Sequence, residues 1–143
     1  SKIMTITEQE YFDRACERLR DGTGRAIHDG RACEYLTKDG RKCVVGIFIP
    51  DGHPAQAFTG SVPRLAGRYP DLAGIAFPGD VTGRGLALAF RLQGAHDSAK
   101  NWEGCKFIGE PALASIAARF NLTYTPPARP AETNNNNNEE GAR

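Results

Sequence analysis

The amino-acid sequence predicts an α+β domain, in which three or four helices pack on a β-hairpin or a small antiparallel sheet. Three observations support this fold class: a capped amphipathic helix near the start, an Asp-Gly turn between two apolar runs, and a strongly helical stretch that begins near residue 86. The alternative is a mainly helical domain, because the continuously apolar run 43–49 could form either a buried strand or a helix.

The first helix is predicted over residues 7–20. Thr7 and Glu10 have the spacing of a capping box, in which each side chain bonds to the backbone N–H of the other residue. Apolar residues then recur with the period of one helical face, and a Gly-rich segment stops the pattern. Further helices are predicted over residues 62–68, over residues 86–99 and from Pro111 onward, since proline suits a first helical position.

The hairpin is predicted from residues 32–37 and 42–49, which flank Asp39-Gly40. Asp-Gly favours a tight two-residue turn, in which both central positions take positive φ. In that register Leu36 faces Cys43. Because neighbouring residues alternate between the faces of a strand, Cys33 and Cys43 then point to opposite sides and share neither a disulfide nor a metal, unless a bulge shifts the pairing.

The chain is predicted to hold one globular domain, residues 5–124, followed by a disordered tail, residues 125–143. Hydrophobic residues make up 40% of the chain and charged residues 24%, as in ordinary globular proteins. The tail instead combines prolines with five consecutive asparagines, and it has too little apolar surface to offset the entropy of ordering.

Charge and motifs argue against several functional classes. The 18 basic and 17 acidic residues give a net charge of +1 and are mixed along the chain, whereas nucleic-acid-binding domains usually gather a basic face. Nucleic acid is therefore not the expected partner. The sequence has no signal-peptide pattern and no long apolar run, so we expect a cytoplasmic protein that does not enter a membrane. It also lacks the P-loop, GxGxxG, HExxH and GxSxG motifs, and no cofactor is expected.

The absence of those motifs does not argue against one catalytic arrangement, a cysteine–histidine pair. Cys43 would lie at a helix N-terminus if residues 43–49 are helical, and the helix dipole would then lower its pKa. His96 could serve as the base, and Asp97, Gln93 or His53 could orient it or build an oxyanion hole. The simpler interpretation is that Cys43 is a core residue in an apolar run and that His96 is an ordinary histidine on a helix face.

Three more residues are candidates for ligand binding, namely His53, Gln93 and Trp102. On the predicted helix 86–99, Gln93 falls on one stripe with Phe90 and Asp97. Trp102 could stack on a ligand, although a single tryptophan is more often a core anchor. The cysteines and histidines show no regular metal-ligand spacing, so no metal site is predicted.

Part of the sequence resembles uncharacterised small proteins of phages, prophages and bacterial mobile elements. The resemblance spans about residues 7–123 and is most specific in the segment 33–51, with a later Leu-Gln-x-x-His-Asp helix. The matching residues of that segment are Cys33-Glu34-Tyr35, Asp39-Gly40 and Lys42-Cys43-Val44-Val45-Gly46-Ile47-Phe48-Ile49-Pro50-Asp51. The chain departs from the pattern at His53-Pro54 and in its Gly-rich segment 74–85.

The resemblance implies no reaction. It implies an accessory protein of a phage or mobile element that binds a host protein or a small ligand. Two alternatives stay open: a cysteine-dependent hydrolase or transferase that uses Cys43 and His96, and a regulator associated with nucleic acid.

Overall fold

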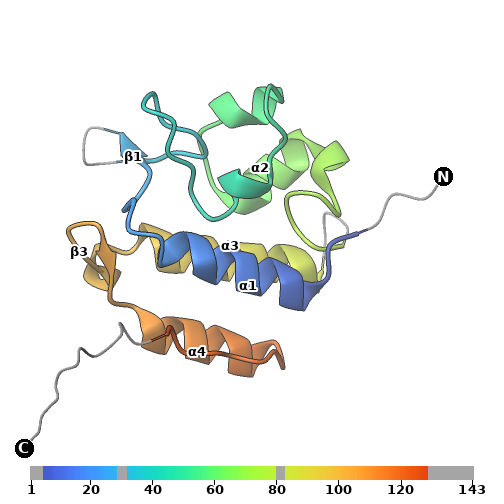
Figure 1. Ribbon diagram of the computed structural model, residues 1–143. Coiled ribbons are helices and arrows are strands. Elements are labelled where there is room, and N and C mark those ends of the chain that lie inside the picture. The colour runs from blue at the N-terminus through green and yellow to red at the C-terminus, as the bar shows by residue number, and fades with distance from the viewer. Residues whose placement is uncertain (1–4, 29–31, 80–82, 129–143) are drawn as a thin grey trace, which may run out of the picture.

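The computed structural model describes residues 5–28, 32–79 and 83–128 and confirms the α+β class. Helix α3 is the central element, and α1, α2 and α4 each pack against it (Figure 1). The helices are α1 (Glu8–Leu19), α2 (Val62–Arg68), α3 (Arg84–Asp97) and α4 (Glu110–Arg119). The strands are β1 (Ile27–His28), β2 (Ala32–Cys33), β3 (Trp102–Glu103) and β4 (Lys106–Phe107).

Helix α1 forms for the local reasons that its sequence indicates. The Thr7 hydroxyl accepts the N–H of Glu10, and the Glu10 carboxylate accepts the N–H of Thr7, so the capping box is complete. The apolar face packs into the core, with Tyr11 and Leu19 fully buried. Stacking of Tyr11 on Phe48, with ring centroids 4.1 Å apart, then joins α1 to the segment that follows the turn at residue 40.

Helix α3 supplies much of the core. Leu88 and Leu92 are fully buried, and each contributes about 1.5–3 kcal/mol through the apolar surface it removes from water. At its start the helix backbone lies directly against the Pro78 carbonyl. A Cβ atom added at Gly85 would lie 1.3 Å from that oxygen, so only glycine fits there.

The predicted pairing of residues 32–37 with 42–49 is wrong. β2 pairs with β1 instead, antiparallel, and only an isolated bridge joins Leu36 to Lys42. Gly40 has positive φ (88°) but Asp39 does not, so the turn is not the two-residue type I′ form. It is a three-residue loop closed by the bond from the Thr37 N–H to the Arg41 carbonyl, which shifts the register by one residue.

This shift removes the predicted pairing of Leu36 with Cys43, and with it the basis for placing Cys33 and Cys43 on opposite faces. The side chain of Cys33 lies outside the residues whose placement the structure describes. The polypeptide from 43 to 49 is neither a strand nor an α-helix. After a turn it forms a short 3₁₀ helix, Gly46–Phe48, with Val44 and Val45 fully buried before it.

A buried arginine satisfies backbone groups at Lys42, where the strand predicted over residues 42–49 would begin. The Arg18 guanidinium donates to the Lys42 carbonyl at 2.6 Å and to the Gly24 carbonyl at 2.7 Å, so these backbone acceptors are satisfied without a partner strand. Close packing also restricts the residue at position 46, where the 3₁₀ helix begins. A Cβ atom at Gly46 would lie 2.0 Å from the Tyr35 carbonyl oxygen, so only glycine fits there.

The end of the predicted domain packs against α1. The Gln9 side chain and the Thr123 backbone exchange two hydrogen bonds, of 2.9 and 3.0 Å. Beyond it, residues 125–128 have no helix or strand, and most of the predicted disordered tail, 129–143, lies outside the described residues. None of the helices in the described part of the chain has the length and apolar character that a membrane crossing requires.

Candidate functional site

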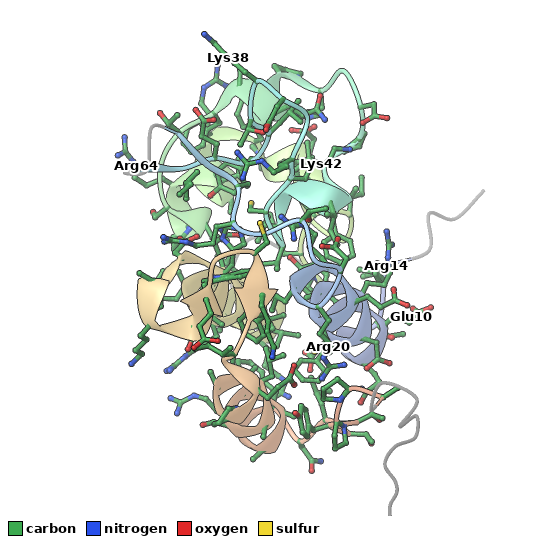
Figure 2. All side chains as sticks on the ribbon, turned by 60° about the vertical axis from the view of Figure 1, so that its left-hand side comes forward. Glu10, Arg14, Arg20, Lys38, Lys42 and Arg64 are labelled. Atoms are coloured by element: carbon green, nitrogen blue, oxygen red, sulfur yellow. The ribbon has the colours of Figure 1, made fainter. Side chains whose placement is uncertain are left out.

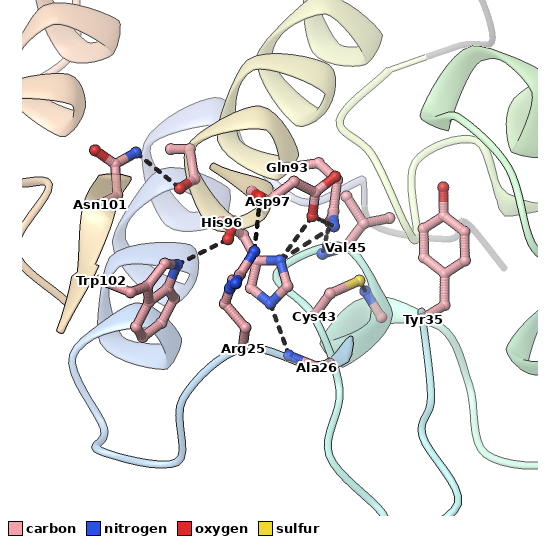
Figure 3. A network of polar contacts seen from close by, with 12 residues as sticks. Arg25, Ala26, Tyr35, Cys43, Val45, Gln93, His96, Asp97, Asn101 and Trp102 are labelled. Atoms are coloured by element: carbon pink, nitrogen blue, oxygen red, sulfur yellow. Dashed lines mark hydrogen bonds and ion pairs between the residues drawn. The ribbon is translucent and has the colours of Figure 1, made fainter. Parts of the chain in front are cut away.

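The last turn of α3 carries three of the candidate residues, Gln93, His96 and Asp97. Their spacing of three and four residues places them on one side of the helix. They meet two other parts of the chain there, the loop before β1 and the turn that contains Cys43 (Figure 3). The sequence candidates Cys43, His96, Asp97 and Gln93 therefore do lie in one region.

His96 is fully buried, and both of its ring nitrogens are engaged. Nε2 accepts the backbone N–H of Ala26 at 3.1 Å, so the proton of the neutral ring resides on Nδ1, which donates to Asp97 Oδ1 at 2.8 Å. Burial lowers the pKa of His96 below its ordinary value, and this effect outweighs the opposing influence of Asp97. The imidazole is thus held neutral, with its basic nitrogen occupied.

Gln93 links the end of α3 to the Cys43 turn. Its Oε1 accepts the N–H of Val45 at 3.3 Å, and its Nε2 donates to Asp97 Oδ1 at 2.8 Å. The Asp97 carboxylate consequently has its Oδ1 fixed by two donors, Gln93 and His96, while its side chain stays 42% exposed.

Cys43 is fully buried, and the Gly46 N–H points at its Sγ from 3.3 Å. Burial raises the pKa of this thiol to about 12, although the nearby N–H groups and Gln93 act in the opposite direction. Among the hydrogen bonds found for the described residues, none joins Cys43 to His96. A high-pKa thiol and an occupied imidazole are typical of core residues rather than of a nucleophile and its base.

Trp102 and His53 have structural contacts of their own. Trp102 is 8% exposed and donates its Nε1–H to the His96 carbonyl at 2.8 Å, which matches the core-anchor interpretation. His53 instead joins a loop to the segment after α2, since its Nδ1 accepts the Ala55 N–H at 3.0 Å and its Nε2 contacts Asp71 at 2.7 Å.

A small cavity lies beside this polar network. Its volume is about 120 Å³. Its lining residues come from three separate segments: Glu34, Tyr35, Gly60, Ser61, Val62, Phe90, Gln93, Gly94 and Asp97. Tyr35 closes one side through a hydrogen bond of 2.8 Å from its hydroxyl to the Gly60 carbonyl. Phe90 lines this cavity, and 51% of its surface is exposed.

Sequence reasoning did not select Phe90, Glu34 or Tyr35 as site residues. For Phe90 a signal existed, because it shares a helical stripe with Gln93 and Asp97, but an isolated aromatic on a helix usually indicates core. Glu34 and Tyr35 come from a distant segment and left no such signal.

Within residues 5–28, 32–79 and 83–128, no group of three or more His, Cys, Asp or Glu side chains is arranged to hold a metal ion. Comparison with known proteins found no matching family model, curated protein or solved structure.

Proposed function

We propose that this chain is an accessory protein of a phage or mobile element that acts by binding a partner protein, and that it binds through the surface around Phe90. We call this surface the Phe90 face and define it by Phe90 and the residues that line the adjoining cavity. The observation that supports the proposal is the 51% exposure of Phe90 beside that cavity. Aromatic side chains next to a pocket are frequent energetic centres of protein interfaces.

The buried network supports binding rather than catalysis. A nucleophilic thiol needs a thiolate and access to substrate, and Cys43 has neither a lowered pKa nor exposed surface. His96 is equally inaccessible, with its Nε2 bonded to Ala26. The phage or mobile-element assignment rests on the resemblance in residues 33–51.

A protein is a better fit than a small molecule or a nucleic acid. Pockets for small molecules usually measure about 300–1,000 Å³, well above the 120 Å³ of this cavity. Charged side chains of both signs are spread over the molecule, from Lys38 and Arg64 at one end to Glu10 on α1 (Figure 2), whereas nucleic-acid-binding domains usually gather a basic face.

The test is affinity capture from a bacterial host lysate with three baits, the natural chain, Phe90→Ser and Ile75→Ser. Ile75 is a matched control because it is 36% exposed but does not line the cavity. Truncation of an interface hot spot costs about 2 kcal/mol or more, a factor of roughly thirty in affinity. We therefore expect a partner that the natural chain and the Ile75 variant capture and that the Phe90 variant loses.

Circular dichroism and thermal unfolding verify that both variants stay folded. Equal capture by all three baits, or no captured protein, would contradict the proposal.

A further inference from the structure

A second hollow, larger than the cavity on the Phe90 face, lies beside the hairpin of β3 and β4. We call it the hairpin groove. Its lining residues are Arg20, Gly22, Glu110 and the segments 105–108 and 127–128, and none of them lines the cavity on the Phe90 face. The groove has a volume of about 660 Å³. Unlike the smaller cavity, it falls within the range of about 300–1,000 Å³ that is usual for small-molecule sites.

The walls of the groove are largely apolar. Ile108, Pro127 and Ala128 line it, and Ile108 is 40% exposed although its side chain is large and hydrophobic. Phe107 adds an aromatic wall that is held by the core, since its ring packs edge to face on Trp102 with centroids 5.2 Å apart. A ligand that covers these groups gains free energy in proportion to the apolar surface it removes from water. The groove therefore favours a ligand with an apolar body.

The charges that line the groove favour an anionic group on that ligand. The carboxylate of Glu110 is already bonded through both oxygens, with Oε2 2.9 Å from Arg20 Nε and Oε1 2.8 Å from Arg20 Nη2. Oε1 also accepts the hydroxyl of Tyr124 at 2.6 Å. Lys106 is exposed, and its ammonium group has no ion pair or hydrogen bond within the described part of the chain. One positive charge in the lining thus stays without a counter-ion.

Arg20 contributes a second donor, which the fold holds in place. Its two bonds to Glu110 and a third, of 3.0 Å, to the Thr125 carbonyl fix the guanidinium group through Nε and Nη2. Among the hydrogen bonds found for residues 5–28, 32–79 and 83–128, none uses Nη1 of this arginine. A donor that is already positioned loses little entropy when it meets a ligand. A carboxylate, with its two acceptor oxygens, complements such cationic donors.

We propose that the hairpin groove binds a small molecule that carries one carboxylate on an apolar body. The carboxylate lies at Lys106 and at Nη1 of Arg20, and the apolar body covers Ile108 and the side chains of residues 127–128. This second binding site is separate from the Phe90 face and does not depend on the partner protein proposed there.

Octanoate is a probe of this chemistry. It is titrated, below its micelle concentration, into the ¹⁵N-labelled full chain. The backbone N–H signals of Gly22 and Ile108 report on the groove, and those of Gly60 and Gly94 report on the Phe90 face. We expect saturable shifts at Gly22 and Ile108 at millimolar concentrations, as for a ligand of this size, and none at the other two. Octylammonium, which has the same chain and the opposite charge, should bind at least tenfold more weakly.

Two pairs of variants separate the charge from the apolar wall. Lys106→Gln should weaken octanoate binding about threefold, as expected for an exposed ion pair, whereas Lys100→Gln should not, because Lys100 is exposed but does not line the groove. Ile108→Ser should weaken it at least threefold, whereas Ile75→Ser, with a similar exposure outside the groove, should leave it unchanged.

Alkylation of Cys105 gives a measurement that needs no variant. Cys105 is exposed and lines the groove, so bound octanoate should slow its reaction with iodoacetamide, with half the effect at the concentration that half-saturates the NMR shifts. Absence of saturation at Gly22 and Ile108, equal binding of octanoate and octylammonium, or unchanged binding by both the Lys106 and Ile108 variants would overturn the proposal. Unprotected Cys105 at saturating octanoate would overturn it as well.

Discussion

Iodoacetamide should modify Cys105 in the native protein far faster than Cys43, since Cys105 is exposed and Cys43 is not. A rise in pKa from 9.0 to about 12 leaves Cys43 with about a thousandth of the thiolate of an ordinary cysteine at neutral pH. The more basic thiolate is intrinsically more nucleophilic by roughly 15- to 30-fold. The pKa alone therefore slows the reaction by roughly 30- to 60-fold, and the free energy of exposing the buried thiol slows it further.

Cys16 is the matched control, because it is 3% exposed and burial raises its pKa to about 12 as well. Timed alkylation followed by peptide mass spectrometry gives the rate for each cysteine, and unfolding in urea should make the three rates similar. If native Cys43 reacts as fast as Cys105 while Cys16 stays protected, the Cys43 thiol is activated. The cysteine-dependent hydrolase or transferase would then replace the binding function.

Three further predictions concern stability. Because burial lowers the pKa of His96 in the folded state below 6.5, the unfolded chain takes up this proton first as the pH falls, so stability should decline below about pH 6.5. Urea midpoints should show that decline for the natural chain, and a His96→Gln variant, although less stable throughout, should lack it. Gly85→Ala should cost more than about 3 kcal/mol through its clash with the Pro78 carbonyl, whereas Gly67→Ala, which meets open space in α2, should be neutral or stabilising. Equal melting temperatures for the two alanine variants would contradict this packing. Leu88→Ala should cost about 2–5 kcal/mol in urea unfolding because it leaves a cavity under the central helix, and a cost below 1 kcal/mol would indicate a looser core.

The sequence predicted those parts of the fold that depend on neighbours in the chain. The capping box at Thr7 and Glu10 involves residues three positions apart, and it forms as expected. The turn at Asp39-Gly40 was located correctly, but its type was wrong because Asp39 does not adopt positive φ. The predicted strand beyond Lys42 is absent, and the Lys42 carbonyl instead accepts a hydrogen bond from Arg18, 24 residues away, a long-range contact that no local pattern shows.

The candidate site also combines features that depend on chain neighbours with features that depend on distant residues. That Gln93 and Asp97 lie together follows from helical spacing alone. The engagement of His96 Nε2 depends on the backbone N–H of Ala26, 70 residues away, and a backbone donor leaves no mark in a sequence. The cavity likewise requires Glu34 to approach α3 from another segment, which residue patterns do not encode.

The polar network connects the core to the Phe90 face through Asp97. Its Oδ1 satisfies the donors of Gln93 and His96, while the same side chain lines the cavity. A buried donor that loses its acceptor costs about 1–3 kcal/mol. Asp97→Asn should therefore lower the free energy of unfolding by about 1–3 kcal/mol. Glu103→Gln, a change of the same kind at an exposed position on β3, should leave that free energy unchanged. Urea unfolding of both variants checks this, and equal stability of the two would mean that the network does not depend on the charge of Asp97.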